Sequence, residues 1–342
     1  MVNIEMDKRY IELNHTVNRI NDWYEKDECR LLNIITVPYN TSRIFRELIT
    51  NILSNNKKIL YVTQDGNVNE DIVKYLKLSF GFKSYSIIRS GSYHSNTYLH
   101  FISFENIRFI EEDYELIIYD DITSFSRQGK LEIQNSVDFL YKRSKKVIVY
   151  STEAVFMNCP YIQLGNCFRM APFVEPRIIT TRIDLNKDIP YLLYDYLKWF
   201  KDNNRKVLIH TPSKEKTEIV YNYYNDILKV SSRMKLVKVT ESSELKTIEK
   251  LHEIKDKPVM VITNLIVQQF EELDNIDVII YFADDKFFDY KKIVYLCGKV
   301  GKVRGAQGEV ILLANEVSTH MEYAKDLARE FNKAAWEKGL LK

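Results

Sequence analysis

Apolar and polar residues alternate along the chain with two periods, which predict helices and strands in turn. The first thirty residues place apolar side chains at helical spacing and predict one amphipathic helix. Short apolar runs typical of strands then follow at Leu31–Val37, Ile59–Thr63, Ser84–Arg89, Leu99–Ser103, Leu116–Asp120 and Val147–Ser151. Helical patterns lie between them at Ser42–Leu53, Asn67–Phe80 and Leu131–Tyr141. This alternation predicts a mainly parallel sheet with helices on both faces.

A second series of the same kind follows the proline-bearing stretch Ala171–Pro176. Its predicted strands are Val207–His210, Leu236–Thr240, Val259–Thr263, Val278–Phe282 and Glu309–Leu313. Its predicted helices are Pro190–Asp202, Lys214–Leu228, Leu245–Ile254 and Thr319–Trp336. The sequence therefore predicts an α/β protein of two tandem domains, 1–176 and 177–342, which are joined near residues 172–187.

Composition narrows the class of protein. The 342 residues carry 49 basic and 47 acidic side chains, and this net charge of +2 excludes a uniformly basic nucleic-acid binder but allows local basic patches. No apolar run approaches the ~20 residues of a membrane helix, and the first residues lack the apolar stretch of a secretory signal. We therefore expect no integral membrane segment and residence in the cytoplasm. The four cysteines and six histidines are scattered, without the spacing of metal ligands.

Residues 31–46 have the layout of a phosphate-binding loop without its chemistry. A buried strand, a polar loop and the start of a helix follow one another in LLNIITVPYNTSRIFR. A working P-loop needs glycines, so that the backbone can wrap the phosphates, and then Lys-Ser/Thr for charge and a magnesium ligand. The loop from Pro38 to Arg43 contains neither glycine nor lysine. Thr41 and Ser42 could still cap the following helix, and Arg43 could stand in for the lysine.

Three further segments carry polar groups where chemistry is expected. The strand in ELIIYDDITSF (115–125) ends in Asp120 and Asp121, as in nucleotide hydrolases that hold magnesium, although aspartates are also common in plain turns. The strand that ends at Ser151 and Thr152 has a polar tip, which a solvated turn also explains. Segment 295–302, YLCGKVGK, either offers lysines to phosphate or forms a flexible basic turn. No G-x-G-x-x-G or G-x-S-x-G occurs, so dinucleotide-dehydrogenase and α/β-hydrolase functions lack their signatures.

Taken in order, these segments resemble the ComFA family of competence-associated superfamily 2 DNA helicases over nearly the whole chain. The matching segments are Lys58–Phe80 after motif I, Leu99–Glu105, 116–125 as motif II, LGNCFRMAPFVEP (164–176) after motif III, VLIHTP (207–212) as motif IV, 262–280 as motif V and 295–302 as motif VI. The resemblance implies two RecA-like domains that form a helicase core. It also implies single-stranded DNA as the ligand, with DNA-uptake or recombination proteins as further partners.

The resemblance also assigns roles to particular residues. The remnant catalytic positions are Asp120 and Asp121, and Asp120 would hold Mg²⁺ only if ATP binds. The remnant phosphate positions of motifs I and VI are Thr41, Ser42, Arg43, Lys299 and Lys302. Nucleic-acid contact or coupling is implied for Ser151, Thr152, Thr211, Thr263, Gln268 and Gln269.

The positions that the family devotes to ATP are altered in this chain. Tyr39–Arg43 replaces the family's G-A-G-K-T, and Asp121 stands where glutamate is expected. Lys299 and Lys302 replace the two arginines of motif VI. Lysine preserves the charge but loses the bidentate fork, and an arginine finger is worth ~10³–10⁵ in rate. These departures predict a weakened or missing nucleotide grip.

The sequence thus predicts a helicase-like protein that binds single-stranded DNA and whose ATP motor is lost or severely impaired. One alternative is an active ATP-dependent DNA translocase with a non-standard P-loop, for which ATP and Mg²⁺ are the cofactors. A second alternative is an accessory scaffold protein of a competence or recombination complex that makes no nucleic-acid contact.

Overall fold

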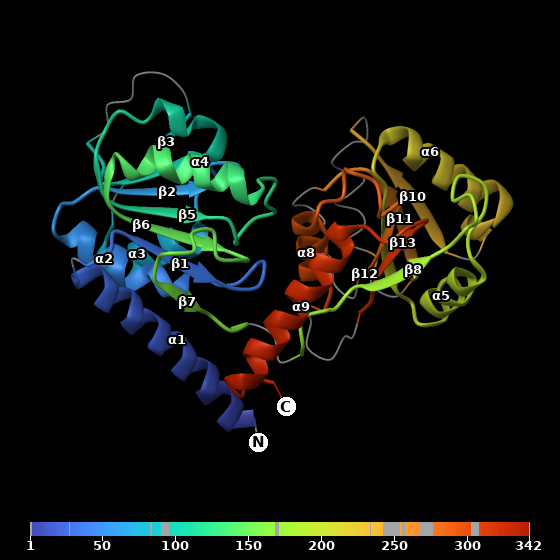
Figure 1. Cartoon of the computed structure of the whole chain (residues 1–342), viewed down its shortest axis with the longest axis horizontal. Coiled ribbons are helices and arrows are strands. Elements are labelled where there is room, and N and C mark those ends of the chain that lie inside the picture. The colour runs from blue at the N-terminus through green and yellow to red at the C-terminus, as the bar shows by residue number, and fades with distance from the viewer. Residues whose placement is uncertain are drawn as a thin grey trace. The chain divides into compact units, whose positions relative to one another are not determined.

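The chain divides into two compact units. Unit 1 comprises Met1–Phe168 together with Lys333–Lys342, and unit 2 comprises Arg169–Asn332 (Figure 1). The computed structural model describes residues 2–26, 28–82, 84–89, 96–167, 171–232, 234–241, 254, 257–266, 276–301 and 308–341. The boundary precedes the one predicted at 176. The C-terminal segment clusters with unit 1, where the Lys338 ammonium contacts the Glu12 carboxylate and the Gln163 carbonyl.

Unit 1 is built on a seven-stranded sheet in the order β3-β4-β2-β5-β6-β1-β7, in which every neighbouring pair is parallel. Its strands are β1 (Leu31–Ile35), β2 (Ile59–Thr63), β3 (Ser86–Ile88), β4 (Leu99–Ser103), β5 (Tyr114–Asp120), β6 (Ser144–Ser151) and β7 (Tyr161–Gln163). Its helices are α1 (Val2–Glu25), α2 (Arg46–Ser54), α3 (Glu70–Phe80) and α4 (Lys130–Tyr141), with 3-10 turns η1 (Arg43–Phe45) and η2 (Phe104–Phe109).

Strand residues of unit 1 alternate between two core layers. In β5, Leu116 and Ile118 belong to the layer that contains residues of α1, α2 and α3, whereas Ile117 and Tyr119 belong to the layer of α4. This two-residue period follows from the pleat of a strand, and both faces are apolar because helices cover both. A residue at the end of a strand therefore points to a face that the alternation sets in advance.

Unit 2 contains a six-stranded parallel sheet in the order β10-β11-β9-β12-β13-β8. Its strands are β8 (Arg177–Thr180), β9 (Lys206–His210), β10 (Lys235–Val239), β11 (Val259–Thr263), β12 (Ile276–Tyr281) and β13 (Val310–Ala314). Its helices are α5 (Tyr191–Asp202), α6 (Lys214–Asn222), α8 (Tyr290–Lys299) and α9 (Thr319–Glu337), with a π turn η3 (Tyr223–Ile227) and a 3-10 turn η4 (Val230–Ser232). Helices α5 and α6 lie on one side of this sheet and α8 on the other (Figure 1).

Three elements differ from the sequence-based prediction. The edge strands β7 and β8 were not predicted, and β8 lies inside the expected linker 172–187. Segment 295–302 is helical up to Lys299, as the end of α8, so the prediction of a flexible turn is wrong for that part. The predicted helix Leu245–Ile254 lies almost wholly outside the described residues. Within the described residues, no helix combines the length and apolarity needed to cross a membrane.

Candidate functional site

The predicted motif residues of unit 1 gather at the carboxyl edge of its sheet. Strands β2, β5, β6 and β1 are consecutive neighbours and run parallel, so the loops that follow them emerge side by side. Ligand sites in open α/β sheets lie at this edge. The loop after β1 carries Thr41 and Ser42, and β5 ends at Asp120. The structure thus brings together the residues predicted for motifs I and II, and we call this place the carboxyl-edge site.

Backbone amides of the loop after β1 donate hydrogen bonds to acceptors within the protein. Tyr39, with a left-handed φ of 60°, donates its amide to the Ile122 carbonyl at 2.9 Å. The Thr41 amide donates to Asn40 Oδ1 at 2.8 Å, and the Arg43 amide donates to Thr41 Oγ1 at 3.1 Å. In a P-loop, amides of this kind point at phosphate oxygens. Here these three amides already have internal acceptors.

Two buried side chains hold the loop in place. Asn40 Nδ2 donates to Thr36 Oγ1 at 2.6 Å and to the Gly165 carbonyl at 2.9 Å. The Tyr150 hydroxyl, at the end of β6, donates to the Thr41 carbonyl at 2.9 Å. Buried polar groups that find partners in this way stabilise one loop conformation and resist rearrangement. The loop is therefore fixed to β6 and to the segment after β7.

Motif II supplies a carboxylate that four donors already surround. Asp120 is fully buried, and its Oδ2 accepts from the hydroxyls of Tyr61 at 2.5 Å and Thr123 at 2.7 Å. Its Oδ1 accepts from the backbone amides of Ile122 and Thr123, both at 3.0 Å. Burial raises the pKa of Asp120 above its ordinary value, and the four hydrogen bonds oppose this rise.

A chain of hydrogen bonds connects the two remnant motifs. Ser42 Oγ donates to Asn69 Oδ1 at 3.1 Å, and Asn69 Nδ2 donates to the Tyr61 hydroxyl at 3.2 Å. Tyr61 then donates to Asp120, as described above. Asn69 also caps helix α3, because its Oδ1 accepts the Ile72 amide at 3.2 Å. The loop after β2 therefore links the motif I and motif II positions through protein atoms alone.

The other residues predicted for unit 1 also face inward. Asp121 is buried and accepts a hydrogen bond from the Ser126 hydroxyl. Ser151 Oγ donates to the Glu153 carbonyl at 2.7 Å, and Thr152 is buried beside it. Thr41 and Ser42 are buried as well, whereas Arg43 is exposed. Of the predicted phosphate positions of motif I, only the arginine reaches the surface.

The carboxyl-edge site does not fit Mg²⁺ and a nucleotide as it is arranged. Magnesium prefers octahedral oxygen ligands and keeps several waters, which requires carboxylate oxygens that face open space. Both Asp120 oxygens accept two protein donors each, and the Thr41 and Ser42 hydroxyls have internal partners. Among the described residues, no group of three or more His, Cys, Asp or Glu side chains could hold a metal ion.

Unit 2 places its predicted residues at the corresponding edge. The Thr211 hydroxyl lies 2.6 Å from that of Thr217, and the Thr211 amide donates to the Thr263 carbonyl at 2.9 Å. Thr263 Oγ1 accepts the Leu265 amide at 2.9 Å. These hydroxyls therefore join β9 to β11 and α6. Gln268, Gln269 and Lys302 lie outside the described residues.

Lys299 lies in the interior of unit 2. It is 1% exposed at the end of α8, close enough to the buried His210 imidazole to affect its titration. Burial first, and then the Lys299 charge, lower the pKa of His210 from 6.5 to about 3. His210 is consequently neutral throughout the physiological range. The motif VI lysine is thus placed beside a buried imidazole at the end of β9.

Sequence reasoning missed Tyr61, Asn69 and Tyr150, which complete the carboxyl-edge site. Tyr61 and Tyr150 lie in predicted strands and Asn69 lies at the start of a predicted helix, so the missing information was how these elements pack together. The strand pairing places Tyr61 opposite Ile118, two residues before Asp120 and on the same face. Alternation along β2 and β5 could therefore have indicated that the tyrosine and the aspartate share a face, but not that they bond.

Comparisons with known proteins identify the fold. No protein-family model matches the sequence, and no curated protein matches it. Among solved structures, the chain is similar to the E. coli DExH-box NTPase HrpB, with 12% identity and a TM-score of 0.52, over 92% of this chain and 42% of that one. It also matches the Mycobacterium smegmatis helicase Lhr, solved with ssDNA and AMP-PNP, with 11% identity and a TM-score of 0.47, over 88% of this chain and 46% of that one.

The similarity to HrpB shows that this chain shares the fold of that DExH-box protein, with two mainly parallel sheets of the RecA-like type. The predicted fold class is confirmed. The chain spans less than half the length of either matched protein. Membership of the ComFA family, and of superfamily 2, stays a prediction.

Proposed function

We propose that this chain is a diverged, ComFA-like member of the superfamily 2 helicases that binds single-stranded DNA and has lost its ATP motor. The observation that carries the proposal is the Asp120 carboxylate, whose two oxygens accept four hydrogen bonds from the protein itself. Phosphoryl transfer depends on positioning and electrostatic stabilisation, so a motif II aspartate that faces inward cannot hold the metal ion.

The loop after β1 supports the same proposal. A nucleotide would need the Thr41 and Arg43 amides and the Ser42 hydroxyl, and each of these has an internal acceptor. Freeing them together would break several buried hydrogen bonds, each worth roughly 0.5–1.5 kcal/mol. The contacts that ATP makes would therefore have to offset the free energy of these broken hydrogen bonds before any net binding resulted.

The fold and the surface chemistry support single-stranded DNA as the proposed ligand. Proteins that bind single strands combine basic side chains with exposed aromatic rings on which bases stack. The described surface offers such rings on both units, among them Tyr161 and Trp336 on unit 1 and Tyr191 and Trp199 on unit 2.

The test combines ATP hydrolysis with DNA binding on the same preparation. We expect no ATP turnover above that of Asp120→Ala, with or without single-stranded DNA. Because the alanine variant removes the two oxygens that accept four hydrogen bonds, Asp120→Asn serves as a second control that keeps the side-chain volume. Fluorescence anisotropy of a labelled oligothymidylate should show binding that weakens as salt rises, since phosphate contacts release counterions.

The alternative functions give different results in the same experiment. DNA-stimulated turnover that both Asp120 variants lose would contradict motor loss and favour the translocase, and Arg43→Ala should then abolish turnover as well. Failure to bind any oligonucleotide at low salt would contradict DNA binding and favour the accessory scaffold protein.

A further inference from the structure

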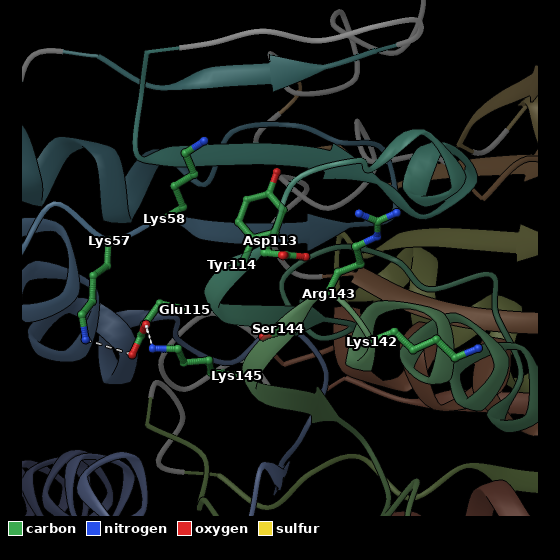
Figure 2. A pocket seen from close by; sticks show the side chains of 9 residues that line it. All are labelled: Lys57, Lys58, Asp113, Tyr114, Glu115, Lys142, Arg143, Ser144 and Lys145. Atoms are coloured by element: carbon green, nitrogen blue, oxygen red, sulfur yellow. Dashed lines mark hydrogen bonds and ion pairs between the residues drawn. The ribbon is translucent and has the colours of Figure 1, made fainter.

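A basic pocket lies at the amino edge of the unit 1 sheet, opposite the carboxyl-edge site. Lys57 and Lys58 precede β2, Asp113 precedes β5, and residues 142–143 form the turn from α4 into β6, which begins with Ser144 and Lys145. Strands β2, β5 and β6 are adjacent and parallel, so their amino ends meet. The pocket has a volume of about 400 Å³ and is lined by Lys57, Lys58, Asp113, Tyr114, Glu115, Lys142, Arg143, Ser144 and Lys145 (Figure 2).

Positive charge exceeds negative charge in this amino-edge pocket. Five of its lining side chains are basic and two are acidic, a surplus of three positive charges. Glu115 lies between two of the lysines, with Lys57 Nζ at 3.0 Å and Lys145 Nζ at 3.1 Å, as Figure 2 shows. Lys58 pairs with Glu112 at 3.0 Å. These pairs neutralise part of the charge and hold three of the ammonium groups around the pocket.

The remaining two cations are presented by a turn whose backbone is fixed from behind. Arg30 donates to the carbonyls of Tyr141 at 2.9 Å, Lys145 at 3.2 Å and Ser144. Among the described residues, neither Lys142 nor Arg143 makes an ion pair, and the Arg143 guanidinium donates to the neutral Glu111 carbonyl. A fixed turn lowers the conformational entropy that a ligand must overcome when these side chains contact it.

We propose that the amino-edge pocket binds the phosphate groups of a nucleotide or of a nucleic-acid strand. The Arg143 fork suits two phosphate oxygens, while the lysines act as point charges around them and the Ser144 hydroxyl adds a polar contact. The volume fits a mononucleotide-sized group. The site uses none of the carboxyl-edge residues, so it stands independently of the proposed loss of the ATP motor.

Charge reversal in the turn tests the proposal against a matched control. Arg143→Glu and Lys142→Glu each change the net charge by two, and Lys187→Glu makes the same change at a strongly exposed position of unit 2. Titration calorimetry would use inorganic pyrophosphate and thymidine monophosphate, and anisotropy would use the labelled oligothymidylate. We expect each pocket variant to weaken binding at least about tenfold, and the control to change it by less than about twofold.

A third variant sharpens the test because its effect has the opposite sign. Glu115→Gln keeps the hydrogen-bonding shape but removes the carboxylate that competes for Lys57 and Lys145, so phosphate binding should strengthen by about threefold or more. Pocket-dependent binding of pyrophosphate or thymidine monophosphate identifies a free nucleotide or phosphate as the source. Pocket-dependent binding of the oligonucleotide alone identifies the nucleic-acid backbone.

Two results would overturn the proposal. One is no binding of any of the three probes to the wild-type protein. The other is an equal loss for Arg143→Glu, Lys142→Glu and Lys187→Glu, which would mean that overall charge alone is sensed. DNA binding that survives both pocket variants would exclude the amino-edge pocket while leaving the proposed single-stranded DNA function intact.

Discussion

The two edges of the unit 1 sheet differ in what their polar groups contact. At the carboxyl edge, Asp120 is fully buried and accepts four internal hydrogen bonds. At the amino edge, Lys142 and Arg143 extend from a fixed turn beside an open pocket. Strand β5 contributes an acid to each edge, Asp120 at one and Glu115 at the other. A polar group at a strand end is thus available to a ligand only when hydrogen-bond partners from the protein itself do not already occupy it.

The largest expected effect is on the free energy of unfolding, when one aspartate at each edge is replaced by alanine. Asp120→Ala leaves the Tyr61 and Thr123 hydroxyls and two backbone amides without their acceptor, so the free energy of unfolding should fall by about 3 kcal/mol or more. Asp113→Ala, on the exposed residue just before β5, should change it by less than about 0.5 kcal/mol. Urea unfolding, with hydrogen exchange of β5 amides, measures both. Equal losses would mean that the two edges do not differ in this way.

A smaller effect, on the pH dependence of stability, tests whether the polar groups at the carboxyl edge of the unit 2 sheet are also inaccessible to solvent. The pKa of His210 is about 3 in the folded chain against 6.5 ordinarily, so the unfolded state binds more protons between these values. Stability should therefore fall as the pH drops below about 6.5, by about 2 kcal/mol between pH 7 and pH 5. His210→Gln should remove this part of the acid sensitivity. Urea unfolding at the two pH values checks it, and an unchanged slope in the variant would contradict an inaccessible imidazole.

The smallest effect concerns the titration of the two β5 acids. Burial acts to raise the pKa of Glu115, but hydrogen bonds from Lys57, Lys145 and Tyr24 lower it below its ordinary value, whereas the pKa of Asp120 is raised. Ionised Glu115 thus stabilises the fold above its ordinary pKa, and this stabilisation is lost as the pH falls through the lowered value. Asp120 has the opposite sign, because its ionisation costs stability above its raised pKa.

Carbon-detected NMR titration should place the two carboxyl groups on opposite sides of their ordinary values. The stability contribution of Glu115 should stay below about 1 kcal/mol, since it is a partly exposed ion pair. The Glu115→Gln variant lacks the Glu115 carboxyl group and so identifies its NMR signal. The titration of Asp120 should be unchanged in this variant. Two acids that titrate together would show that both edges are equally solvated.

Local pattern predicted most of the sheet because apolar runs bounded by polar residues are continuous in the sequence. Strands β2, β4 and β11 have the predicted bounds. The strands β7 and β8 were missed because the segments YIQ and RIIT are short and mix polar with apolar residues, so that no apolar run marks them. Helix α8 was not predicted either, and almost every position in it is buried, Lys291 and Lys299 included.

The carboxyl-edge site was predictable in part. The position of Asp120 at the end of a buried strand and the absence of glycine and lysine from Pro38–Arg43 were evident in the residue order. Three of the donors to Asp120 come from Ile122 and Thr123, which follow it directly, but the Tyr61 hydroxyl could not be predicted because Tyr61 lies on a strand 59 residues earlier in the chain. The basic runs Lys57-Lys58 and 142–146 were visible as well, but only sheet order places them together.

The sequence by itself determined the class of fold and the altered chemistry of the nucleotide loop, because both depend on residue type and periodicity along one segment. Tertiary structure alone decided that the Tyr61 hydroxyl donates to Asp120 and that two distant basic runs share one pocket. These facts depend on strand order and register, which arise from packing between segments far apart in the chain. A strand end can be predicted from its own residues, whereas its availability to a ligand depends on its neighbours.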